Sequence, residues 1–141
     1  MLLNVPAVLV EADQAFPTFG STAGREPAVL AFHQACASWI DLGYVLILDG
    51  SLPYGNNDLR DRCLEVFPPE SLRIIAVTAD VQTLRRREQQ RAEVRDPGWA
   101  EKQAADIHDG ITAAMHLDTS NLDPEGAARA IYSRLVESAN N

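Results

Sequence analysis

The chain has 141 residues, enough for one compact domain with a hydrophobic core. Apolar residues make up 46% and charged residues 23%, which is typical of a folded globular protein and excludes a disordered one. The formal net charge of -8 argues against nucleic acid or an anionic membrane as the main partner. No apolar run reaches the ~20 residues that a membrane helix needs, and the start lacks the regions of a signal peptide. We therefore expect a cytoplasmic protein.

Short apolar segments alternate with helical patterns along the whole chain. Short runs rich in apolar residues predict strands over residues 5–12, 44–48 and 72–78, and a fourth, short strand is expected over 115–118. Between and after them, helices are expected over residues 25–42, from Asn57 as a cap, after Asp80, after Asp96-Pro97 and after Asp123-Pro124. The run at 44–48 is apolar without alternation, which favours a strand covered on both faces. This order predicts an α/β fold, a parallel sheet with helices on both faces, in one domain over residues 1–141.

Acidic residues follow three of the expected strands, at the edge where α/β proteins bind ligands. They are Asp13, Asp49 and Asp80, and the last strand ends in Asp118. Asp49 after the strand is typical of a Walker B carboxylate, which holds Mg²⁺ directly or through water; alternatively, Asp-Gly is a common turn. Asp13 is a candidate general base toward a substrate hydroxyl, or else a helix cap or turn carboxylate.

Five arginines lie on or just after one expected helix: Arg85, Arg86, Arg87, Arg91 and Arg95. Guanidinium groups suit phosphate oxygens and the charge that develops on a transferred phosphoryl group. The strongest candidates are Arg87, Arg91 and Arg95. The alternative is a solvated helix face whose arginines pair with Glu88 and Glu93.

The chain contains no Walker A motif, G-x-x-x-x-G-K-S/T. Residues 20–26, GSTAGRE, are only superficially similar, because three residues separate the glycines and arginine replaces lysine. They also do not follow a buried strand, whereas a phosphate cradle needs a strand, a loop and a helix in that order.

Four segments together resemble the chloramphenicol phosphotransferase-like family of small P-loop kinases. They are VLVEADQAFP, YVLILDG, ADVQTLRRREQQRAEVRDPGWAEKQAADIHDG and AAMHLDTSNLDPEGAARAI. The resemblance implies a P-loop kinase-like fold that uses ATP and Mg²⁺. It also implies that Asp13 is the general base, that Asp49 is the magnesium-associated acid, and that Arg87 and Arg95 are lid arginines contacting the nucleotide.

That family opens with a strand, a Walker A loop and a helix, and residues 1–4 would fall near the end of that helix. We therefore expect the first strand, which is central in the family's sheet, and the P-loop to be missing from this chain. The resulting expectation is an ATP-dependent phosphotransferase acting on a small-molecule hydroxyl, impaired without Walker A. The alternative is a non-catalytic nucleotide- or anion-binding or regulatory domain that acts as a homo-oligomer.

Overall fold

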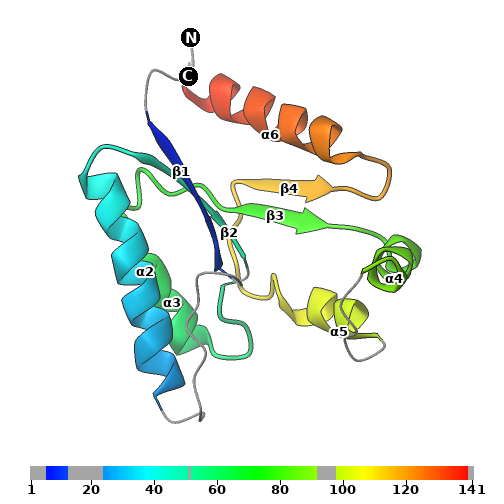
Figure 1. Ribbon diagram of the computed structural model, residues 1–141, viewed down its shortest axis with the longest axis horizontal. Coiled ribbons are helices and arrows are strands. Elements are labelled where there is room, and N and C mark those ends of the chain that lie inside the picture. The colour runs from blue at the N-terminus through cyan, green and yellow to red at the C-terminus, as the bar shows by residue number, and fades with distance from the viewer. Residues whose placement is uncertain (1–5, 13–23, 51, 92–97, 140–141) are drawn as a thin grey trace. The chain divides into compact units, whose positions relative to one another are not determined.

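The computed structural model describes residues 6–12, 24–50, 52–91 and 98–139, with side chains up to residue 135. In the described residues, four strands alternate with five helices in the predicted order (Figure 1). The elements are β1 (Ala7–Glu11), α2 (Arg25–Asp41), β2 (Val45–Asp49), α3 (Asn57–Glu65), β3 (Ile75–Thr78), α4 (Val81–Gln89), α5 (Trp99–Asp106), β4 (Met115–Asp118) and α6 (Pro124–Ala139). The predicted α/β class with parallel strands is confirmed.

The chain divides into two compact units, Met1–Leu72 and Arg73–Asn141. Within the described residues, each unit contains one two-stranded parallel sheet, β1 with β2 in the first and β3 with β4 in the second. Among the described strands, β2 and β3 therefore belong to separate sheets. The single-domain organisation and the missing central strand both stay predictions.

In the first unit, β1 and β2 pair in register from Ala7 opposite Val45 to Glu11 opposite Asp49. Helix α2 connects the two strands, as a parallel crossover requires, and it contacts both β2 and α3. The core of this unit consists of Cys36, Leu59, Cys63 and Phe67, with His33 buried among them. The ring of His33 lies edge-on to Phe67, with centroids 6.2 Å apart, and its Nδ1 lies 2.8 Å from the carbonyl oxygen of Val29.

The prediction that the second strand is covered on both faces is wrong in this structure. Val45 and Ile47 on β2 are 42% and 54% exposed, and Leu9 on β1 is 60% exposed. The burial pattern alternates along both strands, with Leu46 and Leu48 on the more buried face. An apolar run predicts burial but does not say how many layers pack against the strand.

In the second unit, β3 and β4 pair in register from Ile75 opposite Met115 to Thr78 opposite Asp118. Ala76 and Leu117 are buried, and α6 contacts β4. The third strand starts later than predicted, at Ile75 instead of residue 72.

Several helix starts follow from side chains that accept hydrogen bonds from the first turn. Asp80 caps α4 as predicted, because its carboxylate accepts a 2.7 Å hydrogen bond from the Thr83 N–H. Helix α6 begins at Pro124 as expected, and the Asp123 carboxylate accepts from the Gly126 N–H at 2.7 Å. The predicted start of α5 at Asp96-Pro97 lies outside the described residues.

The predicted cap of α3 is wrong by one residue. Asn56, not Asn57, is the cap: its Oδ1 accepts from the Leu59 N–H at 3.1 Å. Its Nδ2 also donates to Glu26 on the first turn of α2 at 2.9 Å, so one side chain ties two helix starts together. Either asparagine could cap a helix by composition, and only the local backbone decides between them.

The two neighbouring asparagines provide a matched test of this assignment. Asn56→Ala should lower the free energy of unfolding by about 1 kcal/mol through loss of the cap. Asn57→Ala, on the exposed first residue of α3, should change it by less than about 0.5 kcal/mol. Urea unfolding followed by circular dichroism measures both variants. Equal destabilisation by the two substitutions would show that the cap is misassigned.

Candidate functional site

Two acidic residues lie at the carboxyl end of the β1–β2 sheet. Glu11 ends β1, Asp49 ends β2, and the register places them directly opposite each other. Both residues are exposed. Like charges directly opposite each other on paired strands are destabilising unless other groups offset them. The sequence analysis did not single out Glu11, because only the strand register shows that it faces Asp49.

The chemistry of this pair fits Mg²⁺. Magnesium prefers oxygen ligands and is usually held by one or two carboxylates, with waters and substrate phosphates completing its coordination. In the part of the chain that the structure describes, no group of three or more His, Cys, Asp or Glu side chains could enclose a metal ion.

Two of the predicted site residues cannot be placed. Asp13 and Arg95 lie outside the described residues, so their roles stay predictions.

A buried threonine organises the corresponding end of the β3–β4 sheet. Thr119, only 8% exposed, donates its N–H and its hydroxyl to the carbonyl oxygen of Thr78 at 2.8 and 2.9 Å. The guanidinium of Arg87 donates to the Thr119 hydroxyl at 2.9 Å and to its carbonyl oxygen at 2.7 Å. Arg87 therefore fastens α4 to the end of β4, and these bonds use two of its five N–H donors.

Ser120 connects the two aspartates at this end. Its hydroxyl accepts from the Asp80 N–H at 2.8 Å and donates to the carboxylate of Asp118. The Ser120 hydroxyl and N–H lower the pKa of Asp118, and the charge of Arg87 lowers it further. The Thr83 N–H is the main cause that lowers the pKa of Asp80. Both carboxylates are therefore ionised at neutral pH.

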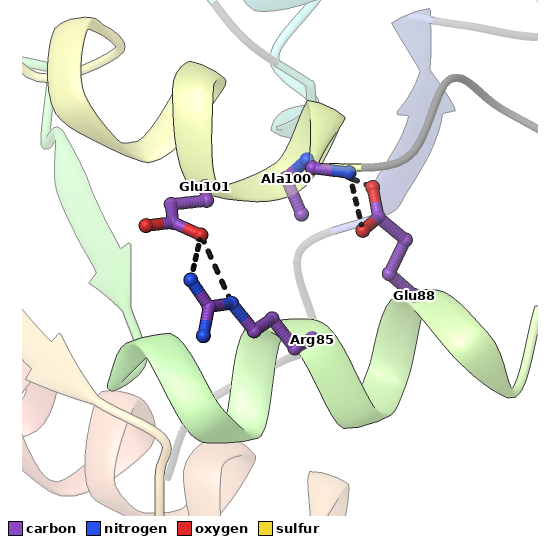
Figure 2. Close-up of polar contacts among 5 residues, drawn as sticks. Arg85, Glu88, Ala100 and Glu101 are labelled. Atoms are coloured by element: carbon purple, nitrogen blue, oxygen red, sulfur yellow. Dashed lines mark hydrogen bonds and ion pairs between the residues drawn. The ribbon is translucent and has the colours of Figure 1, made fainter.

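The described arginines of α4 and the residues just after it have different surroundings. Arg85 donates two hydrogen bonds to Glu101 on α5, at 3.0 and 2.8 Å (Figure 2). Arg86 donates to the Thr83 hydroxyl at 3.3 Å, and Arg87 is held by Thr119. Within the described residues, Arg91 is exposed and its guanidinium makes no hydrogen bond or ion pair, so its donors are available to an anion.

The alternative expectation was that the arginines pair with Glu88 and Glu93. Of these two glutamates, the structure describes Glu88. The Glu88 carboxylate accepts hydrogen bonds from backbone N–H groups of α5, and the charge of Arg91 contributes only a minor part of its lowered pKa. Glu93 lies outside the described residues. Nothing in the sequence pattern of α4 indicated that Glu88 would reach the next helix.

In the described residues, the groups suited to binding a nucleotide are arginine guanidinium groups, not the backbone N–H groups of a phosphate-binding loop. The full sequence contains no Walker A motif, and only the end of the GSTAGRE segment is described, where Gly24 precedes α2 without a side-chain cap. On and just after α4, Arg91 and the remaining donors of Arg86 and Arg87 could contact phosphate oxygens.

Within the described residues, no helix has both the length and the apolarity needed to cross a bilayer.

Comparison with known proteins places the chain in a family. No curated protein matches the sequence. The family model of chloramphenicol phosphotransferase-like proteins matches residues 5–136, so the chain belongs to that family, which the sequence motifs had predicted.

Proposed function

We propose that this chain serves ATP-dependent phosphoryl transfer to a hydroxyl group of a small molecule. The observation that carries this proposal is the family match over residues 5–136, which points to a kinase-type phosphotransferase. The matched range includes the carboxylate pair at the β1–β2 end and the arginines of α4. Those two groups supply the charges that the reaction needs, namely acids for Mg²⁺ and cations for phosphate.

The acceptor side of the reaction is assigned to Asp13. The acceptor hydroxyl oxygen attacks the γ-phosphorus, its proton passes to the Asp13 carboxylate, and the bond from the γ-phosphorus to the ADP oxygen breaks. Bound Mg²⁺ would neutralise charge on the phosphate oxygens. Asp49, with Glu11 opposite it, would hold that ion.

The arginines take different parts in the proposal. Arg91 contacts phosphate oxygens directly, since its guanidinium is exposed and without a hydrogen bond in the described part of the chain. Arg87 is set in place by Thr119 and keeps three N–H donors for the nucleotide. Arg95 is the third cation, by resemblance to the family's lid.

A second candidate function is favoured by the absence of the Walker A motif from these 141 residues. The cradle and its lysine supply much of the nucleotide affinity of P-loop enzymes. Transfer by these residues alone is therefore expected to be impaired. A non-catalytic nucleotide- or anion-binding domain, acting as a homo-oligomer, would need only the arginines.

Titration calorimetry with ATP and Mg²⁺ separates the two functions. The 141-residue chain should bind ATP weakly. A longer form that includes in-frame upstream sequence with a Walker A motif should bind at least about tenfold tighter, because the cradle adds backbone donors, and should transfer phosphate to a hydroxyl acceptor. An upstream stop codon without such a motif would favour the binding domain. If neither form binds ATP, the nucleotide-dependent proposal is wrong.

Substitution of the proposed base tests the catalytic assignment. In a form that turns over, Asp13→Ala should lower kcat by about 100- to 10,000-fold, because general-base catalysis contributes that much. The ATP dissociation constant should stay nearly unchanged, since Asp13 acts on the acceptor. On the same preparation, steady-state rates give kcat and calorimetry gives the ATP dissociation constant. Parallel loss of rate and ATP affinity would mark Asp13 as a structural residue.

The two described arginines should differ in a measurable way. Arg91→Ala should weaken ATP binding by about tenfold without changing the free energy of unfolding, because it removes a charged hydrogen bond made only to ligand. Arg87→Ala should weaken binding and also lower the free energy of unfolding by about 1–3 kcal/mol, because the buried Thr119 carbonyl loses a charged donor.

Arg86→Ala is the matched control for both variants, since it removes the same charge from the same short stretch of chain. It should affect stability and binding least. Unchanged ATP affinity in Arg91→Ala would remove that residue from the site.

A further inference from the structure

Helix α5 begins without a capping side chain of its own. The residue before it, Gly98, has a left-handed backbone with φ 79° and contributes no side-chain hydrogen bond. The first N–H groups of a helix have no partner inside the helix and need an acceptor from elsewhere. Here the acceptor comes from α4: Glu88 Oε2 accepts from the Gly98 N–H at 3.1 Å, and Oε1 accepts from the Ala100 N–H at 3.0 Å (Figure 2).

The Glu88 carboxylate lies where a helix favours negative charge. The N-terminus of an α-helix carries a partial positive charge, and its N–H groups point toward an anion. The Ala100 N–H is the largest cause that lowers the pKa of Glu88, with further contributions from the backbone of Gly98 and Trp99. The carboxylate is therefore ionised at neutral pH and acts as an anion supplied by the chain itself.

A second contact joins the same two helices. Arg85 reaches Glu101, in the first turn of α5, through two hydrogen bonds to one carboxylate oxygen. Arg85 and Glu88 are three residues apart, so both project from the same side of α4. Figure 2 shows the two side chains rising from α4 toward α5 at separate points. Two separated contacts restrain rotation of one helix against the other better than one contact does.

Arg87 contacts a second neighbour of α4. It is bonded to Thr119 at the end of β4, and Arg91 lies two residues past Gln89, the last residue of the helix. Helix α4 is thus held both by α5 and by the end of β4. Any rotation of α4 that would move Arg87, and with it the segment that carries Arg91, must break one of these two sets of bonds.

We propose that Glu88 is a positioning residue, which uses the N-terminus of α5 to hold α4 in the orientation that presents Arg87 and Arg91 to the nucleotide. The inference rests on the proposed function. Donors that are fixed before the reaction need no reorganisation when charge develops, so their loss lowers kcat more than it weakens binding. A second consequence is that the start of α5 does not serve as a phosphate site, because Glu88 already occupies it.

The test compares Glu88→Ala, Glu88→Gln and the control Glu125→Ala, in the form of the chain that binds ATP. Glu125 is an exposed glutamate of α6 in the same unit, paired with Arg129. Amide hydrogen exchange follows the N–H groups of Gly98, Ala100 and Lys102, the last of which donates to the Gly98 carbonyl oxygen. Steady-state kinetics gives kcat and KM for ATP, and both measurements are repeated with added acetate.

Glu88→Ala should exchange these amides about tenfold faster, as expected for loss of a cap, and should lower kcat more than it raises KM. Acetate should restore part of both losses, since its carboxylate can occupy the vacated position. Glu88→Gln should fall between the alanine variant and the wild type, because its amide oxygen still accepts one hydrogen bond. Glu125→Ala should change none of these quantities, with or without acetate.

Each contrary result would overturn one stated part of this proposal. Unchanged amide exchange in Glu88→Ala would show that Glu88 does not cap α5. Faster exchange with unchanged kcat and KM would show that Glu88 is a cap without a positioning role. If the wild-type protein neither binds ATP nor transfers phosphate, the proposed function fails and positioning fails with it, while exchange and acetate rescue still decide whether Glu88 caps α5.

Discussion

Parallel pairing of strands decides where the polar side chains of this protein can meet. In a parallel pair both carboxyl ends lie at the same edge, so residues far apart in sequence become neighbours there. Glu11 and Asp49 are brought opposite each other in this way in the first unit. In the second unit, Asp80 and Asp118 are joined through Ser120. The register of the paired strands is enough to bring together the acidic residues of each unit.

Thr119 shows how one buried polar residue can place a whole helix. Its hydroxyl and backbone groups are hydrogen-bonded to Thr78 and Arg87, so burying it costs little. The bond to Arg87 sets α4 against the end of the sheet, and Glu88 then sets α5 against α4. The arginine-rich helix is therefore not a uniform basic surface. Its three arginines all make hydrogen bonds within the protein, and the exposed Arg91 follows just after the end of the helix.

The sequence predicted the order and type of the elements well because these depend on local patterns. The strand at Met115–Asp118, the cap at Asp80 and the helix start at Pro124 all follow from runs and turn residues within a few positions. The errors and omissions arise from contacts between distant residues. Glu11 was missed because its importance depends on register, and Glu88 because its partners lie 10 and 12 residues further along the chain. The exposure of Val45 and Ile47 depends on how many layers cover the sheet, which an apolar run does not encode.

The acidic composition limits how a nucleotide could be held. A chain with a net charge of -8 repels a polyanion at long range, and that repulsion is screened beyond about 10 Å at moderate salt. Binding must therefore come from cations close to the phosphates. Arg85 is neutralised by Glu101, and Arg87 lies near the ionised Asp118. In this part of the chain, the charges of Arg91 and of Arg86, which is bonded to the neutral Thr83 hydroxyl, remain for an anion. At the end of the β1–β2 sheet the fixed charges have the opposite sign, because Glu11 and Asp49 end paired strands. These acids would repel a phosphate unless a divalent cation lay beside them, and that is the part given to Mg²⁺ in the proposed function.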